Sequence, residues 1–491
     1  MENQSILLVN PRYTERVYRV KKSPSGLRPP LGLAYLASSL EKEGFKIEIL
    51  DANAEFLTPE ETAERIINSS HKYIGFTVVT ITMPIVNQIS RLVKNARPEK
   101  FIMVGGPHAT FMAEDTLKEC PAIDLVVKGE GEITASELLK ALQKNEDVSQ
   151  IKGITFRKGN EIMSNPDREL IENIDELPFP ARHLLPRHLY SQDYLTDLGF
   201  KNIQSDSVIT ARGCPNRCVF CSSAAYWKRV RARSPENVVA ELEWLKKEYN
   251  IKYINFLDDT IILNGERMAK ICSLMLEKKI NINWSCYARV TYITPELVAL
   301  MKKAGCRFIN FGVESGNQDI LKRIQKNITL DEVRRAIKTV KKAGLKVMCD
   351  FMVGLPGDTR ETVQQTIDFA KELSPNFAFF SITTPFPGTG LYEDLRREGL
   401  VEGGYIWQNM SLHERTNFHT PTLSNQDLQN LYARAHRQFY YRPAFIFQTI
   451  KWVLLHPYEL RNFYFLTQLQ ISREMRNISD AFSKLKEIIF K

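Results

Sequence analysis

Apolar, strand-like runs alternate with amphipathic helical segments along most of this 491-residue chain, in two successive blocks. In the first block, strands are expected at Ser5–Val9, Lys46–Leu50, Tyr73–Val78, Phe101–Val104 and Asp124–Val127. Helical periodicity is found at Leu31–Glu43, Pro59–Asn68, Pro84–Asn95, Ala113–Lys118 and Glu132–Gln143. This alternation predicts an α/β fold in which helices cover a doubly wound, Rossmann-like parallel sheet.

Glycines gather where two strands of the first block end. Ligands of doubly wound sheets bind beyond the carboxyl ends of the strands, and glycine there lets the backbone approach a bulky ligand. The candidate ligand contacts are Gly105, Gly106, Gly129 and Gly131. The same glycines are equally consistent with tight strand-to-helix turns. No G-x-G-x-x-G motif opens the first helix, which argues against a nicotinamide or flavin dinucleotide.

The second block repeats the alternation six times. Its strands are expected at Ser207–Ala211, Tyr253–Leu257, Ile282–Ser285, Phe308–Gly312, Lys346–Val353 and Phe377–Ile382. Its helices are expected at Glu236–Tyr249, Glu266–Glu277, Pro295–Lys303, Leu330–Ala343 and Glu361–Leu373. Six such units have the length of a partial (β/α)6 barrel, in which functional groups stand at the carboxyl ends of the strands.

Four regions follow from this organisation. The first block is expected to form a domain over residues 1–145, and residues 146–200 to form a hairpin and a proline-stiffened linker. The barrel is expected to span residues 201–395, followed by a helical C-terminal domain over residues 396–491. In that last region a nearly uncharged helix is expected at Ala444–Leu455, too short to cross a bilayer. It is interpreted either as a wall of the substrate cavity or as an interfacial helix that touches lipid.

Three cysteines lie in one short loop directly after the first strand of the second block. Cys214, Cys218 and Cys221 have the spacing C-x3-C-x2-C. Thiolates crowded this closely are disulfide partners, zinc ligands or iron–sulfur ligands. Structural zinc normally takes four protein ligands, and no fourth cysteine or histidine stands nearby in the sequence. Three thiolates on a four-iron cluster would leave one iron open for chemistry.

This cysteine spacing, with Phe220 directly before the last cysteine, resembles the cluster loop of the radical S-adenosylmethionine (SAM) enzymes. The segments Arg28–Leu33, Val104–His108 and Lys128–Glu132 resemble the N-terminal half of the cobalamin-binding members of that family. The resemblance implies a [4Fe–4S] cluster on the three cysteines, SAM on the open iron, and cobalamin bound to the first domain. The loop after the first strand lacks the D-x-H-x-x-G histidine, and His108 follows the fourth strand, so no histidine beneath the cobalt is expected.

The strand ends of the second block offer groups that suit the zwitterionic SAM. A carboxylate can accept hydrogen bonds from its amino group or ribose, and the guanidinium of Arg289 can pair with its carboxylate. By resemblance, Asp258 or Asp259 contacts the SAM amino group. Glu314 matches the residue that contacts the ribose, and Val353 with Gly354 matches the segment that contacts adenine. Each residue taken alone is equally well explained as a helix cap or a surface ion pair.

The resemblance also implies the reaction. Electron transfer from the cluster cleaves SAM, and the resulting 5′-deoxyadenosyl radical attacks an unactivated carbon of the substrate. Methyl transfer that uses cobalamin is the favoured outcome. Radical ring formation, rearrangement or carbon–carbon coupling of a lipid, isoprenoid or tetrapyrrole without methylation is the alternative. A non-catalytic cobalamin carrier is disfavoured because it would have no use for a cluster with an open iron.

Composition adds limits on compartment and partners. Eight cysteines and no signal peptide before the first strand favour a reducing cytoplasm. Cys272, Cys286, Cys306 and Cys349 are interpreted as core residues. The net charge of +9 is not gathered into one basic run, so nucleic-acid binding is not indicated. The expected partners are a small hydrophobic substrate and a reductant such as flavodoxin or ferredoxin in anaerobic conditions, with peripheral membrane contact as an option for the tail.

Overall fold

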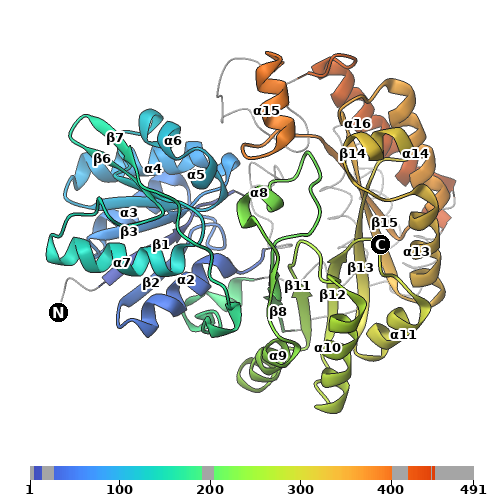
Figure 1. Ribbon diagram of the computed structural model, residues 1–491, viewed down its shortest axis with the longest axis horizontal. Coiled ribbons are helices and arrows are strands. Elements are labelled where there is room, and N and C mark those ends of the chain that lie inside the picture. Colours follow the sequence, from blue (N-terminus) through green and yellow to red (C-terminus); the bar gives the residue numbers. More distant parts are fainter. Residues whose placement is uncertain (1–4, 14–26, 191–203, 401–418, 444, 448–491) are drawn as a thin grey trace, which may run out of the picture.

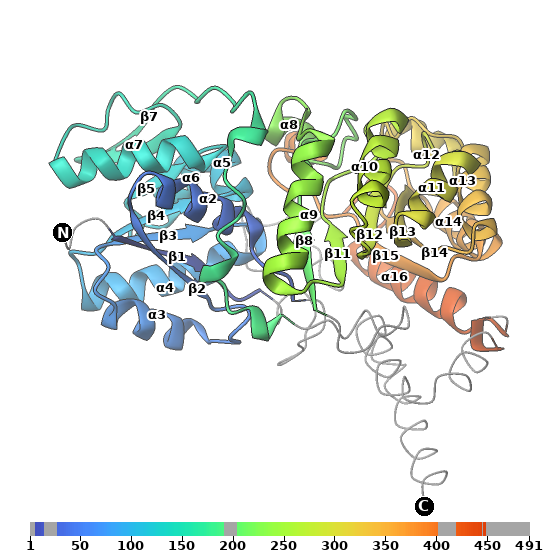
Figure 2. The same ribbon diagram turned by 90° about the horizontal axis from the view of Figure 1, so that it is seen from below.

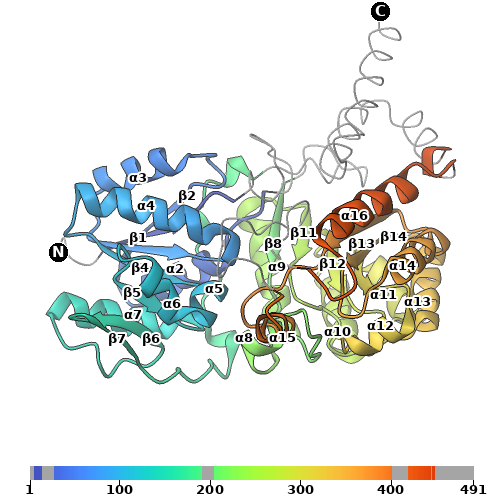
Figure 3. The ribbon, with the colours of Figure 1, turned by 90° about the horizontal axis from the view of Figure 1, so that it is seen from above.

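Two parallel sheets, one in each half of the chain, organise the molecule (Figure 1). The computed structural model describes residues 5–13, 27–190, 204–400, 419–443 and 445–447. The predicted α/β fold is confirmed, with a doubly wound N-terminal sheet followed by a six-stranded parallel sheet. The short helix α8 (Ser223–Trp227) lies between the two units in all three ribbon views (Figures 1, 2 and 3).

The first sheet has the strand order β2-β1-β3-β4-β5-β6-β7, and its first five strands are parallel. Its strands are β1 (Ser5–Asn10), β2 (Lys46–Asp51), β3 (Tyr73–Thr77), β4 (Phe101–Gly105), β5 (Leu125–Val127), β6 (Ile154–Lys158) and β7 (Glu161–Ser164). The strand order reverses between β1 and β3, the kind of switch point at which ligands of such sheets bind. The predicted hairpin is β6 and β7, which extend this sheet: β6 pairs antiparallel with β5, and β7 pairs antiparallel with β6.

Helices cover both faces of the first sheet, which explains its nearly continuous apolar strands. The helices are α2 (Leu31–Lys42), α3 (Pro59–Asn68), α4 (Met83–Ala96), α5 (Pro107–Phe111), α6 (Ala113–Glu119) and α7 (Gly131–Lys144). Ile6 and Leu8 share a core with α2 and α7, whereas Leu7 and Val9 share a second core with α3, α4 and α6. The period of two along β1 therefore divides its side chains between two apolar layers.

The second sheet has the order β15-β14-β13-β12-β11-β8, and all its strands are parallel. The strands are β8 (Ser205–Val208), β11 (Tyr253–Phe256), β12 (Asn283–Ala288), β13 (Cys306–Glu314), β14 (Lys346–Val353) and β15 (Phe377–Ile382). The helices are α9 (Pro235–Tyr249), α10 (Gly265–Glu277), α11 (Pro295–Lys303), α12 (Gln318–Arg323), α13 (Leu330–Lys342) and α14 (Arg360–Leu373). Figure 1 shows most of these helices along the outer side of the curved sheet, as expected of the predicted partial barrel.

One apolar core lies between this sheet and its helices, and it contains the four cysteines predicted to be core residues. Strand β14 shows how the side chains divide. Cys349 and Phe351 are fully buried in that core, whereas Met348, Asp350 and Met352 are half-buried. Because successive side chains of a strand point to opposite faces, the half-buried set lies on the inner face of the barrel.

The first strand of the barrel differs from its predicted bounds. The predicted strand Ser207–Ala211 is wrong at both ends, since β8 covers Ser205–Val208 and is followed by a separate short strand, β9 (Ala211–Arg212). Between them, the backbone N–H of Thr210 donates to Asp258 Oδ1 at 2.8 Å. The Asp258 carboxylate thus accepts a hydrogen bond that a neighbouring strand would otherwise accept, and the pairing of β8 with β11 ends here. Strand β9 then pairs antiparallel with β10 (Arg231–Ala232).

Two further helices close the barrel. Helix α15 (Gly390–Arg397) follows β15, and α16 (Asn425–Tyr440) places Leu428, Leu431 and Phe439 in the barrel core. The helix predicted at Ala444–Leu455 lies outside the described residues, apart from 445–447. Within the described ranges, every helix is too short or too polar for a transmembrane span.

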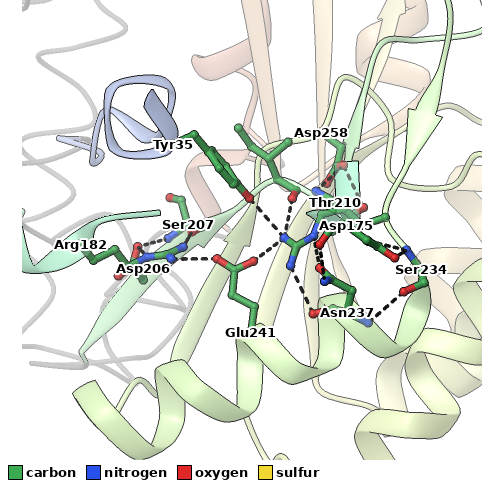
Figure 4. A network of polar contacts seen from close by, with 12 residues as sticks. Tyr35, Asp175, Arg182, Asp206, Ser207, Thr210, Ser234, Asn237, Glu241 and Asp258 are labelled. Carbon is green, nitrogen blue, oxygen red and sulfur yellow. Dashed lines mark hydrogen bonds and ion pairs between the residues drawn. The ribbon is translucent and has the colours of Figure 1, made fainter. Parts of the chain in front are cut away.

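A buried ionic network holds the predicted linker between the two units (Figure 4). Arg182 of the linker is fully buried and pairs with Glu241 of α9 at 2.8 Å and Asp206 of β8 at 3.2 Å. Glu241 also pairs with Arg233, whose guanidinium donates to the Tyr35 hydroxyl of α2 at 3.3 Å. Linker, first domain and barrel therefore share one set of charges, which fixes their relative placement.

Candidate functional site

The cysteine loop lies between β9 and α8, at the carboxyl end of β8. It leaves β9 through Gly213, whose φ is +96°. A β-carbon there would lie 2.9 Å from the Arg229 carbonyl oxygen, so only glycine permits this close approach. Further along, the Val219 N–H donates to the carbonyl of Ile324, and the Leu391 N–H donates to the carbonyl of Val219. The loop is thus held from both sides by the barrel.

Each of the three thiols of this loop lies near a hydrogen-bond donor. Cys214 Sγ lies 3.4 Å from Asn216 Nδ2, Cys221 Sγ accepts from the Ser223 N–H at 3.5 Å, and Cys218 Sγ lies 3.9 Å from Arg289 Nη1. The pKa of Cys221 is raised to about 11, mainly by desolvation and less by the charges of Asp259, Cys218 and Cys214. No cysteine among the described residues is in a disulfide.

This donor set fits an iron–sulfur cluster better than a single metal ion. Over the ranges that the structure describes, no three histidine, cysteine, aspartate or glutamate side chains gather around one ion position. A four-iron cluster does not require that, because each cysteine ligates a different iron. N–H donors directed at the sulfurs would stabilise the thiolates that such a cluster needs.

The adjacent aspartates at the end of β11 have different surroundings. Asp258 is buried, and its Oδ1 accepts from the Thr210 N–H at 2.8 Å and the Thr210 hydroxyl at 2.9 Å. Burial raises its pKa to about 6, and its Oδ2 is buried with no hydrogen-bond partner. Asp259 is exposed and accepts from the Ser223 hydroxyl at 2.5 Å. Asp258 therefore holds Thr210 in place at the strand end, whereas the carboxylate of Asp259 is exposed beside the cysteine loop.

Arg289 and Glu314 lie at the ends of β12 and β13, and both contact Lys326. Lys326 was not predicted from the sequence. Lys326 Nζ lies 2.7 Å from Glu314 Oε1, and its carbonyl accepts a hydrogen bond from Arg289. All three side chains are buried. Glu314 adopts a left-handed backbone with φ of +71°, which is uncommon for a residue other than glycine. Such strain concentrates at functional sites.

An acid–amide pair lies on the inner face of the barrel, on the same strands as Glu314 and its neighbour β14. Asn310 Nδ2 donates to Asp350 Oδ2 at 3.0 Å. Asn310 is buried, and its Oδ1 has no hydrogen-bond partner. The pKa of Asp350 is raised to about 7, mainly by burial and less by the nearby Glu314 carboxylate. Sequence reasoning missed this pair, although a lone aspartate within the apolar run of β14 is a signal that could have found it.

The segment predicted to contact adenine, Val353 with Gly354, mainly makes packing contacts within the barrel. The Val353 side chain is fully buried in the barrel core. Gly354 has a φ of +86°, and a β-carbon there would lie 2.5 Å from Leu428 of α16. Asp358 Oδ2 accepts from the Gly354 N–H at 3.0 Å. This glycine admits α16, so any ligand contact of the segment would be made by backbone atoms alone.

The four predicted glycines of the first domain also divide in role. Gly106 has a φ of +106°, and a β-carbon there would lie 2.8 Å from the Val78 carbonyl oxygen, so the turn itself requires glycine. At Gly105 and Gly131 a β-carbon would make only ordinary contacts. Gly129 has a φ of +68°, and nothing lies within 4 Å of its β-carbon position. That open side fits a cradle for a bulky ligand.

His108 is not placed as a metal ligand by its surroundings. Its side chain is buried, and Nδ1 lies 3.2 Å from the Thr80 hydroxyl oxygen. Burial lowers the pKa of His108 to about 3, so the ring is neutral at physiological pH.

The loop that carries Gly129 and the cysteine loop contact each other directly. The Tyr226 hydroxyl of α8 donates to the Gly129 carbonyl at 3.2 Å. Buried ion pairs join Glu130 and Glu132 to Arg212 and Arg231, on the strands that flank the cysteine loop. These four charged residues were not predicted as a group. The alternation of Arg231 and Arg233 is the signal that could have found part of it, because this pattern indicates a strand with one buried face.

Two family profiles match the chain. The profile of the B12 binding domain matches residues 20–139, and that of the radical SAM superfamily matches residues 208–370. The first range covers β2 to β5 of the doubly wound sheet, and the second covers most of the barrel, including all three loop cysteines.

Named relatives agree with these profiles. The chain is 37% identical to an uncharacterized methyltransferase of Pyrococcus horikoshii, over 92% of this chain and 95% of that protein. It is 28% identical to the anaerobic magnesium-protoporphyrin IX monomethyl ester cyclase of Cereibacter sphaeroides, over 89% of this chain and 71% of that protein. The solved structure of the cobalamin-dependent SAM radical enzyme OxsB, with aqua-cobalamin and SAM bound, shares the fold. Its TM-score is 0.69 at 19% identity, over 99% of this chain and 75% of that one.

Proposed function

The chain belongs to the radical SAM superfamily, as a member with an N-terminal B12-binding domain, and we propose that it is a cobalamin-dependent methyltransferase acting on an unactivated carbon. The observation that carries this proposal is the direct packing of the Gly129 loop against the cysteine loop, which brings the two expected cofactor sites to one junction. The methyltransferase named among the relatives supports methyl transfer. The named cyclase supports the alternative, radical ring formation.

The residues of this chain divide the cofactor binding among them. We assign Cys214, Cys218 and Cys221 to the [4Fe–4S] cluster, with one iron left for SAM. Cluster and SAM together supply a radical, and cobalamin supplies the methyl group. Asp259 is assigned to the SAM amino group, because Asp258 is already engaged by Thr210. Further contacts are assigned to Arg289 and Glu314 for SAM, the Val353–Gly354 backbone for adenine, and Gly105, Gly106, Gly129 and Gly131 for cobalamin.

The substrate is a small molecule, and we propose that it is largely apolar with one polar group. Met348 and Met352 flank Asp350 on the inner face of β14, and Phe379 is its register partner on β15. An apolar wall of this kind stabilises a hydrocarbon body at about 25 cal/mol per Å2 buried. The open acceptor of Asn310 and the carboxyl of Asp350 suit a single hydroxyl or amine.

Product stoichiometry distinguishes methyl transfer from ring formation. Protein reconstituted anaerobically with iron, sulfide, cobalamin and SAM would be incubated with extracts and with methyl-deuterated SAM, and new masses would be recorded. Methyl transfer predicts S-adenosylhomocysteine and 5′-deoxyadenosine in equal amounts and a product heavier by one labelled methyl group. Deoxyadenosine without S-adenosylhomocysteine would contradict methyl transfer and favour the alternative. Cys221→Ala is the control that should form neither.

We also propose two interaction partners, an acidic reductant and a membrane surface. The exposed Arg217 in the cysteine loop suits an acidic reductant such as flavodoxin or ferredoxin. Exposed Ile446 and Phe447, at 42% and 73%, suit a peripheral membrane contact. Arg217→Glu should slow reduction by flavodoxin but not by dithionite. Ile446→Lys should lower co-sedimentation with liposomes, and unchanged co-sedimentation would dismiss the membrane contact.

A further inference from the structure

The cysteine loop together with α8 runs from β9 to β10, and both ends of this segment are attached to the same carboxylate of the first domain. Strand β9 precedes the segment and β10 follows it, and Arg212 and Arg231 are register partners on these two strands. Glu130 Oε1 pairs with Arg212, and Glu130 Oε2 pairs with Arg231 Nη1 at 2.7 Å. Cys214 follows Arg212 by two residues, so a displacement of Glu130 that moves Arg212 would also displace the first cysteine.

The surroundings of Glu130 make this attachment firm. Glu130 and both arginines are buried, each at most 9% exposed. The Ile171 N–H donates to Glu130 Oε2 at 2.9 Å, and Arg231 donates to the Ile171 carbonyl at 2.7 Å. Each carboxylate oxygen of Glu130 thus has a charged partner in the barrel, and breaking the Glu130–Arg231 contact would remove the ion pair of the buried Arg231.

Glu132 offers a natural comparison within the same network. Its Oε1 lies 2.5 Å from Arg212 Nη2, but no ion pair joins it to Arg231 within the described residues. Glu132 therefore holds one end of the cysteine loop, whereas Glu130 holds both. The two carboxylates have the same charge and similar burial, so they differ mainly in whether the far end of the loop is attached.

Glu130 is also the residue directly after Gly129. The Gly129 N–H donates to the Thr110 hydroxyl at 2.9 Å, and the Gly129 carbonyl accepts from Tyr226 of α8. The side of Gly129 where a β-carbon would lie is open. A corrin seated on that side would restrict the Gly129–Glu130 backbone, and the two ion pairs would carry that restriction to both ends of the cysteine loop.

We propose that Glu130 is a positioning residue that couples the two cofactor sites, so that cobalamin binding in the first domain strengthens SAM binding at the cluster. This inference rests on the proposed function, since it requires both cofactors. Coupling of this kind is reciprocal, so SAM must strengthen cobalamin binding by the same factor. Coupling energies between such sites typically correspond to changes in affinity of about 5- to 150-fold.

The test compares Glu130→Gln with Glu132→Gln in the full chain with its cluster reconstituted and unreduced, so that SAM is not consumed. SAM affinity is measured by equilibrium dialysis with and without hydroxocobalamin, and the electron paramagnetic resonance spectrum of a reduced sample is recorded for each state. We expect wild type and Glu132→Gln to bind SAM at least about 5-fold more tightly with cobalamin. Glu130→Gln should keep its iron and both ligands, yet show less than about a 2-fold change and no cobalamin-dependent change in the spectrum.

Several results would overturn the inference. They are full coupling in Glu130→Gln, equal loss of coupling in both variants, and absence of coupling in the wild type although both cofactors bind. Absence of cobalamin binding by the wild type would instead overturn the proposed function, and the inference with it. If Glu130→Gln loses its iron, Arg231→Gln replaces it, because this variant frees the far end of the loop and leaves Arg212 with both carboxylates. Full coupling in Arg231→Gln would then overturn the inference.

Discussion

Replacement of Lys326 by methionine should destabilise the barrel strongly, because it leaves the carboxylate of Glu314 buried without its partner. The two groups lie 2.7 Å apart with side chains 8% and 10% exposed. Removing one member of a buried ion pair costs about 3–5 kcal/mol.

A neighbouring carboxyl makes this loss depend on pH. The pKa of Asp350 is raised to about 7, first by burial and then by Glu314, and the Lys326 charge lowers it, so removal of Lys326 raises that pKa further. The destabilisation should therefore be larger at pH 7.5 than at pH 5.5, where Asp350 is protonated with or without Lys326. With about 2–4 °C per kcal/mol for a unit of this size, the melting temperature should fall by about 10 °C at pH 7.5 and by less at pH 5.5.

The assay is thermal unfolding by circular dichroism under anaerobic conditions at both pH values. Lys322→Met is the matched control, since Lys322 lies on the neighbouring helix with its side chain 73% exposed. The double variant Lys326→Met with Glu314→Gln should recover more than half of the loss, because no buried charge remains. A loss no larger than that of Lys322→Met, or the same loss at both pH values, would refute the reasoning.

Three further predictions concern the cofactor sites and the inner face. Alanine at Cys214, Cys218 or Cys221 should abolish iron binding and SAM cleavage, whereas Cys272→Ala should leave about four irons per chain, by colorimetric assay. Gly106→Val should unfold the first domain, because its β-carbon would overlap the Val78 carbonyl, whereas Gly129→Ala should cost about 1–2 kcal/mol and retain less cobalamin after desalting. Limited proteolysis separates these two outcomes, and equal proteolysis of both variants would contradict the distinction. The pKa of Asp350 is raised to about 7 in the folded protein, so its ionisation opposes folding as the pH rises from about 4 to 7. Asp350→Asn should therefore raise the melting temperature at pH 8 and have a smaller effect at pH 5.5, and an equal effect at both would count against this view.

Much of the fold could be predicted from the sequence, because its signals are local. The period of two in Ser5–Val9 and of 3.6 in Leu31–Glu43 is set by side chains a few residues apart, and burial of one face dictates each pattern. The cysteine spacing is equally local, since the three thiols must reach one cluster from one loop. For this reason the two sheets and their order along the chain were correctly predicted.

The roles of individual site residues depended on contacts between distant parts of the chain. Asp258 and Asp259 are neighbours in sequence, but Thr210 engages the first and leaves the second open beside Ser223. Val353 with Gly354 was predicted to contact adenine, and the structure adds that the absence of a side chain at Gly354 makes room for Leu428 of α16. No local pattern marks such choices, because the partner of each residue is brought near only when the strands and helices have packed.

The buried charges between the Gly129 loop and the cysteine loop also could not be paired from local sequence patterns. Glu130 lies in a glycine-rich turn that the sequence marked as a ligand contact, and Arg212 and Arg231 lie 82 and 101 residues further along the chain. Burial makes their pairing obligatory, since an unpaired charge there would be costly. The sequence by itself marked the cysteine loop and the Gly129 loop as candidate cofactor sites. The tertiary structure alone decided that one carboxylate would hold those loops together, because pairing of buried charges depends on which groups folding brings within reach.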